Sequence, residues 1–148
     1  MKPEVNEILT GLLGAVITDI APHLPEGYPQ GSMSLVALLM MFSAQEYDRA
    51  AEVRFNENLA MRGLFVDAAR DVPDPDLQRR LLKAGNESDE SLLISALNAS
   101  NCELKELLVE LHLATEMNDT PWAHNTDELI WAMLEEFTAA RKLDLPAF

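Results

Sequence analysis

The sequence predicts an all-α fold, an up-and-down bundle of four long helices with a short extra helix. No stretch shows the sustained alternation of apolar and polar residues that is typical of a half-buried strand. Apolar residues instead recur at helical spacing through long segments rich in helix formers. Short segments with proline, glycine and helix-capping residues separate these stretches. We therefore expect a single domain over residues 1–148, a size that suits one hydrophobic core.

The first expected helix covers residues 3–21. Pro3 is tolerated there because the first turn of a helix needs no backbone N–H donor at that position. The helix ends before PHLPEGYPQG, residues 22–31, where three prolines and two glycines interrupt regular structure.

The second expected helix is very long. Ser32 or Ser34 caps its start, and no proline interrupts it over residues 33–71. At the rise of an α-helix it would be nearly ~60 Å long. Gly63 is the residue at which it would bend or break.

Three further helices are predicted by cap residues and prolines. Asp-Pro at 74–75 is a typical cap and first residue, and it opens a short helix over residues 75–84 at the corner of the bundle. The acids and serines that follow open a third main helix over residues 88–118. Thr-Pro at 120–121 is a second pair of cap residue and proline, and it opens the last helix, over residues 121–143.

Acidic residues strongly outnumber basic ones. The chain holds 25 Asp and Glu against 11 Lys and Arg, a net charge of −14 at pH 7. A field of this sign repels phosphate backbones and anionic lipids, so we expect neither nucleic acid nor a membrane as a partner, whereas a basic protein is favoured. The single cysteine excludes an intramolecular disulfide. The N-terminus is unlike a signal peptide. The longest unbroken apolar run, residues 35–42, is too short to span a bilayer. We therefore expect a cytoplasmic protein.

Each long helix carries an apolar stripe that we expect to face the core. The stripes are Val5, Ile8, Leu9, Leu12, Val16 and Ile20 in the first helix, Leu35, Leu39, Phe42, Ala50, Val53, Ala60, Met61, Leu64 and Ala68 in the second, Leu93, Leu97, Leu104, Leu108 and Leu111 in the third, and Trp122, Leu129, Ile130, Met133, Phe137 and Ala140 in the last. Two helices are also apolar on the opposite side, at Met40, Met41, Phe55 and Leu59 and at Ala99, Cys102, Val109 and Leu113. A helix that is apolar on two sides is central in the fold or belongs to a subunit interface. We expect a homodimer.

Two acids in SAQEYDRAAEVRFNEN, residues 43–58, are expected to point toward the core. Glu46 and Glu57 are eleven residues apart, which is about three helical turns, so they share one side of the helix with the apolar stripe. A buried carboxylate must be paired, protonated or bound to a metal. Arg49 and Arg54 each lie three residues from one of these acids and are the local partners. One structural interpretation is two ion pairs that fix the helix register, and another is that the apolar stripe is less buried at these acids than elsewhere.

The alternative interpretation is a metal site. Carboxylates and imidazoles that converge from several helices hold iron or manganese in helical bundles. The Glu-x-x-His motif of such sites is absent, but two Asp/His or His/Glu pairs occur at a spacing of four residues. The candidate ligands of iron, manganese or zinc are Glu46, Glu57, His112, Glu116, Asp19 and His23.

No catalytic motif accompanies these acids. The glycine-containing segments lack the spacing and the lysine of a phosphate loop, and neither Cys102 nor the nearby serines have a histidine at an activating spacing. The sequence therefore favours a non-enzymatic, acidic helical-bundle protein that acts through a homodimer or another protein–protein association, as a chaperone, adaptor or inhibitor does. The alternative function is a bundle that binds a metal or small ligand, with oxidoreductase or hydrolytic activity.

Overall fold

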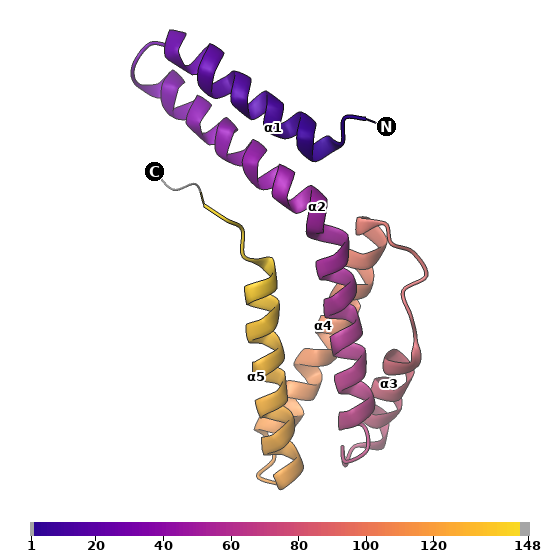
Figure 1. Cartoon of the computed structure of the whole chain (residues 1–148). Coiled ribbons are helices and arrows are strands. Elements are labelled where there is room, and N and C mark those ends of the chain that lie inside the picture. The colour runs from indigo at the N-terminus through magenta and orange to yellow at the C-terminus, as the bar shows by residue number, and fades with distance from the viewer. Residues whose placement is uncertain (1, 146–148) are drawn as a thin grey trace. The chain divides into compact units, whose positions relative to one another are not determined.

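The computed structural model describes residues 2–145, and every regular element within them is helical (Figure 1). The α-helices are α1 (Val5–Ala15), α2 (Tyr28–Ala68), α3 (Pro75–Asn86), α4 (Ile94–Glu116) and α5 (Pro121–Arg141). A π-helical turn, Val16–Ile20, and a 3-10 turn, Ala21–His23, extend α1. The all-α class is confirmed, as are the very long second helix and the short helix before the third main one.

The chain divides into two compact units. The first unit is Met1–Ala50 with Leu143–Phe148, and the second is Ala51–Lys142. Helix α2 passes from one into the other, and with 41 residues it is far longer than the 11-residue α1. Helix α1 is therefore too short to accompany α2 along its whole length, and the two halves of α2 take different neighbours.

The proline-based starts of two helices are confirmed. Asp74 is the N-cap of α3, and its Oδ1 accepts a hydrogen bond of 3.0 Å from the backbone N–H of Asp76. Thr120 is the N-cap of α5, which begins at Pro121. Helix α2 begins at Tyr28, earlier than expected, because a proline in the first turn needs no backbone donor. It continues unbroken through Gly63.

Helix α4 begins at Ile94, six residues later than the expected residue 88. The acids and serines of residues 86–91 do not cap a helix there, and Asp89 and Ser91 have other partners. Asp89 is held by Asn58 and Arg62 of α2. Ser91 Oγ accepts a hydrogen bond of 3.2 Å from the backbone N–H of Leu93, the N-cap residue.

The hydrophobic core of the second unit lies between the C-terminal half of α2 and helices α3, α4 and α5. Its fully buried side chains are Met61, Phe65, Leu81, Leu111 and Ile130, surrounded by Leu77, Leu104, Leu107, Leu108, Met133 and Phe137. The core includes Leu104, Leu108 and Leu111 of the stripe predicted for α4 and Ile130, Met133 and Phe137 of the stripe predicted for α5, so these positions are confirmed. Leu93, Leu129 and Ala140 are exposed instead, so the prediction is wrong for them.

Two glycines of this unit should respond oppositely to alanine substitution. A Cβ at Gly63 would meet no atom within 4 Å, so Gly63→Ala is expected to stabilise the protein by roughly 0.5–1 kcal/mol through reduced freedom of the unfolded chain. A Cβ at Gly85 would lie 2.7 Å from Val66 Cγ2 and 3.0 Å from the Arg62 carbonyl oxygen. Gly85→Ala is therefore expected to destabilise by about 1–3 kcal/mol. Urea unfolding followed by circular dichroism measures both, and equal effects would contradict the close packing at Gly85.

In the first unit, α1 runs beside the N-terminal half of α2 as a helical hairpin (Figure 1). No residue of α1 is buried. The stripe residues Val5, Ile8 and Leu12 are exposed, and so are Leu35 and Leu39 of α2. The expected burial is therefore wrong for these five residues, whereas Val16 is buried as expected and Leu9 and Phe42 are half-buried.

The helical stretch Val5–His23 is long and apolar enough to cross a membrane, judged by length and composition alone. The sequence-based estimate, which considered unbroken apolar runs only, missed it because glycines and threonines are scattered among its apolar residues. Only 6% of this stretch is buried. The first unit therefore presents an unusual amount of apolar surface.

Candidate functional site

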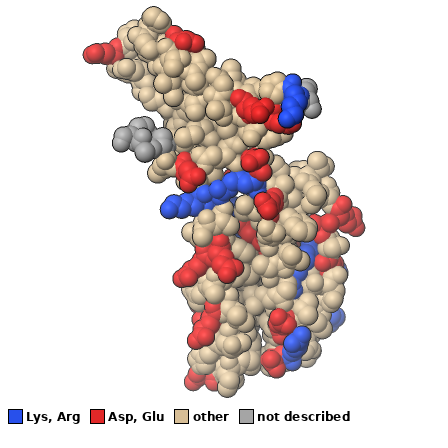
Figure 2. Space-filling view, viewed as in Figure 1, with Lys and Arg blue, Asp and Glu red and all other residues tan. Residues whose placement is uncertain are grey.

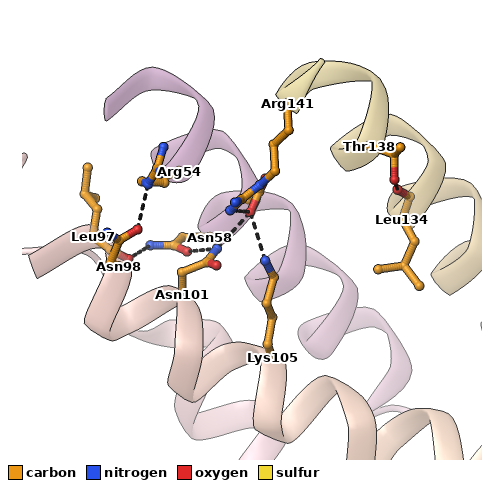
Figure 3. Close-up of polar contacts among 10 residues, drawn as sticks. Arg54, Asn58, Leu97, Asn98, Asn101, Lys105, Leu134, Thr138 and Arg141 are labelled. Carbon is orange, nitrogen blue, oxygen red and sulfur yellow. Dashed lines mark hydrogen bonds and ion pairs between the residues drawn. The ribbon is translucent and has the colours of Figure 1, made fainter. Parts of the chain in front are cut away.

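Glu57 of α2 lies at the centre of a buried polar cluster that joins three helices (Figure 3). The residue is only 2% exposed. Arg141, near the end of α5, binds both of its carboxylate oxygens, with Nε 2.5 Å from Oε1 and a terminal nitrogen 2.8 Å from Oε2. This two-pronged contact is the strongest geometry for an arginine–carboxylate pair. The expected burial of Glu57 is therefore confirmed.

Helix α4 supplies two more donors to the same carboxylate. Asn101 Nδ2 donates a hydrogen bond to Glu57 Oε2 at 3.0 Å, and Lys105 Nζ lies 3.4 Å from the same oxygen. Arg54, the local partner that the spacing predicts, donates its Nε–H to Asn98 Oδ1 at 2.6 Å. The partners of Glu57 thus come from other helices, so the pair fixes the positions of α2, α4 and α5 against one another.

The charge on Glu57 is stabilised despite its burial. Burial by itself raises the pKa of the carboxyl, but the hydrogen bonds from Arg141 and Asn101 and the attraction of Lys105 outweigh it and hold the pKa below its ordinary value. Glu57 is therefore ionised at neutral pH, and its oxygens are already occupied by donors. This arrangement is structural and leaves little room for a metal ion.

The polar cluster continues from Glu57 to the loop before α4. Asn101 Nδ2 also donates to Asn58 Oδ1 at 2.9 Å, and Asn58 Nδ2 donates to Asp89 Oδ2 at 3.0 Å. Arg62, one turn after Asn58 on α2, donates to Asp89 Oδ1 at 3.2 Å. A continuous chain of hydrogen bonds therefore links the end of α5 to the 87–93 loop.

Arg62 and Asp89 form a second buried ion pair. Arg62 also donates to the carbonyl oxygen of Ala84 at 2.6 Å and to Ser100 Oγ at 2.9 Å. Burial raises the pKa of Asp89, but the hydrogen bonds from Ser100, Asn58 and Arg62 together hold it below its ordinary value. Both carboxylates of the cluster are thus held in the charged form by partners within the second unit.

An open cavity of about 590 Å³ lies beside this ion pair. Its lining comprises Arg62, Ala96, Ser100, Glu103 and the loop residues Asn86, Glu87, Ser88, Asp89, Glu90 and Ser91. Four carboxylates against one guanidinium give the cavity a negative charge. A lysine or arginine side chain fits that charge better than an anion does.

The other sequence-predicted ligands lie in different surroundings. In the first unit, Asp19 and His23 are exposed and Glu46 is half-buried. In the second unit, His112 Nε2 lies 2.9 Å from Asp127 Oδ1 and 3.9 Å from Glu116 Oε1. The His112 ring packs edge-on against Trp131, with ring centroids 5.4 Å apart. Asp127 is a partner of His112 that the sequence analysis did not identify.

Within residues 2–145, no three or more histidine, cysteine, aspartate or glutamate side chains are arranged to hold a metal ion. Glu57 is bound by Arg141, Lys105 and Asn101, whereas His112 contacts Asp127 and Glu116. The structure therefore brings His112 and Glu116 near each other but gives Glu57 different partners.

The first unit contains an apolar groove of about 600 Å³ between α1 with its π-helical turn and the start of α2. One wall comprises Leu13, Val16, Ile17 and Ala21, and the other comprises Met33, Ser34, Leu35, Ala37, Leu38 and Met41. Ser34 is the only lining residue with a polar side chain. Such a surface suits apolar side chains of a partner.

Comparison of the chain with protein-family models, with curated proteins and with solved structures finds no match.

Proposed function

We propose that the protein acts by association, as a homodimer or with another protein, and that the exposed apolar surface of its first unit is the binding surface. The observation that carries this proposal is the set of exposed aliphatic side chains on α1 and α2, at Val5, Ile8, Leu12, Leu35 and Leu39. Apolar patches of this kind on a protein surface mark sites of interaction. Acting by association is a role of chaperones, adaptors and inhibitors.

The charge distribution supports a second contact, with a basic protein. Acidic side chains are spread over the visible face of the second unit, as Figure 2 shows, whereas much of the first unit is uncharged. The acid-lined cavity beside Arg62 accepts a cationic side chain on the grounds of charge. The apolar surface would then provide the affinity, and the acidic surface the preference for basic partners. We propose a cytoplasmic location on the grounds of the net charge of −14 and the single cysteine.

The association proposal predicts that the apolar surface is either covered by a partner or open to a hydrophobic dye. Light scattering on a sizing column gives the molar mass, and fluorescence of an anilinonaphthalene sulfonate dye reports open apolar surface. Leu12→Gln is expected to weaken the assembly or, in a monomer, the dye binding. Leu113→Gln is the control, because the two leucines are 49% and 51% exposed and lie in different units. A monomer that binds no dye would contradict the proposal.

A further inference from the structure

We infer that the partner of the apolar surface is a second copy of the chain, and that the α1–α2 hairpins of two copies pack into an intermolecular four-helix bundle. This inference rests on the proposed function and names the partner for it. In such a bundle each helix contacts its hairpin neighbour and a helix of the other copy. The helices must then be apolar in two directions.

Helix α2 meets this requirement in its N-terminal half. Ala37, Leu38 and Met41 line the groove toward α1. Val36 and Leu39 lie outside that groove and are exposed. Among the residues that the structure describes, α2 thus has an apolar side that lines the groove toward α1 and further apolar side chains, Val36 and Leu39, that are exposed outside it.

Helix α1 shows the same division. Leu13 and Val16 line the groove toward α2. Val5, Ile8 and Leu12, which recur at three- and four-residue spacing, are exposed. The apolar arc of α1 is thus wider than one neighbouring helix covers, as expected for a helix with two neighbours.

Charge favours this surface over any other for contact between two copies. Each copy carries −14, so most approaches bring carboxylates together. Residues 8–18 and 27–45 contain no charged side chain. The exposed Val109 and Leu113 of α4, by contrast, lie among Glu106, Glu110 and Glu116 in the sequence. The hairpin is therefore where two acidic copies meet with the least repulsion.

The exposed area is close to what a stable dimer needs. The exposed aliphatic side chains of residues 5–39 are Val5, Ile8, Leu12, Ile17, Ile20, Leu35, Val36 and Leu39. At roughly 80 Å² each they present about 600 Å² per copy, near the ~800 Å² per partner of a standard interface.

A membrane fits the hairpin less well than a second copy does. Helices that lie in or span a bilayer are usually flanked by lysine and arginine, which contact the lipid head groups. Between Lys2 and Arg49 the chain has no lysine or arginine, and Asp19 lies within the apolar stretch Val5–His23. The acidic hairpin would thus be repelled by anionic lipid.

The test compares Leu39→Glu with Leu59→Glu. The two leucines lie on the same helix and are 55% and 59% exposed, so both substitutions add one negative charge at a site of similar exposure. Leu39 belongs to the first unit and Leu59 to the second. Light scattering on the wild type should give about 33 kDa, twice the 16.5 kDa chain. Leu39→Glu should raise the dimer dissociation constant at least about 100-fold, and Leu59→Glu less than about threefold.

Leu39→Lys separates lost apolar contact from added repulsion. Leu39→Lys should also break the dimer, although it lowers the net negative charge of the chain. Circular dichroism should show unchanged helix content in all variants. A monomeric wild type that binds the dye would overturn the second-copy inference but retain the proposed function. Dimers of equal strength in both glutamate variants would also overturn it. Leu39-dependent binding of a monomer to phosphatidylcholine–phosphatidylglycerol vesicles would replace the second copy by a membrane.

Discussion

Replacing Arg62 with methionine is expected to lower the free energy of unfolding by about 3–5 kcal/mol, because it leaves a buried carboxylate without its cation. The side chains of Arg62 and Asp89 are 9% and 5% exposed. The substitution also removes the donors to the Ala84 carbonyl and to Ser100 Oγ. Asn58 and Ser100 alone would then have to hold the charge of Asp89. Urea unfolding at neutral pH measures the loss.

An exposed pair provides the control for Arg62. Arg70 and Asp67 of the same region form an ion pair whose side chains are 71% and 66% exposed. Arg70→Met should therefore change the free energy of unfolding by less than about 0.5 kcal/mol. Adding Asp89→Asn to Arg62→Met should recover part of the loss, because it removes the stranded charge. A loss below about 1 kcal/mol for Arg62→Met alone would show that Asp89 is solvated.

The helices were predictable from the sequence because their signals are local. Apolar periodicity and the Asp-Pro and Thr-Pro starts act within one or two turns, and the structure follows them at α3 and α5. The start of α4 was placed six residues too early because Asp89 has tertiary partners on α2. Local cap propensity cannot anticipate a contact that forms only when two distant segments pack.

The buried acid was predictable, but its partners were not. The position of Glu57 in the apolar stripe indicates burial, since residues eleven apart share a helix face. Arg141 lies 84 residues further along the chain, and no spacing rule links the two. A signal for Asn101 did exist, because it falls between Leu97 and Leu104 on the buried side of α4. A polar residue at such a position predicts a buried hydrogen-bonded contact.

The stripes of the first unit illustrate a different limit. Their periodicity assigns Leu35 and Leu39 to one apolar stripe, yet Leu35 lines the groove toward α1 and Leu39 lies outside it, and both are exposed in one chain. Periodicity identifies a face that needs a neighbour, but it does not say whether that neighbour belongs to the same chain. The association proposed above would resolve the difference between the pattern and the exposure, because a second chain would cover the exposed side chains.

Loss of Arg141 should destabilise the protein in a manner that depends on pH. At neutral pH, Arg141→Met is expected to cost roughly 1–3 kcal/mol, less than the loss of a fully buried pair, because the Arg141 side chain is itself 42% exposed and Lys105 and Asn101 still contact Glu57. The wild-type pKa of Glu57 lies below its ordinary value of 4.5, so the stability it contributes is present above that pH and is lost as the pH falls through the folded-state pKa. Without Arg141, burial raises the pKa again.

The difference in stability between wild type and Arg141→Met should therefore be largest near neutral pH and shrink as the pH is lowered through the folded-state pKa of Glu57, which lies below 4.5. Asp89 also loses its charge in acid, but it is present in both proteins, so its contribution cancels in the difference. Glu57→Gln supplies the control: in that background Arg141→Met should cost less than about 1 kcal/mol and show no dependence on pH. Urea unfolding of the four proteins across this pH range measures the coupling. If Arg141→Met costs the same free energy at every pH in the protein that keeps Glu57, Arg141 stabilises α5 by packing and not through the charge of Glu57. The pH dependence decides between the two explanations because only an interaction with the ionised carboxylate is lost in acid.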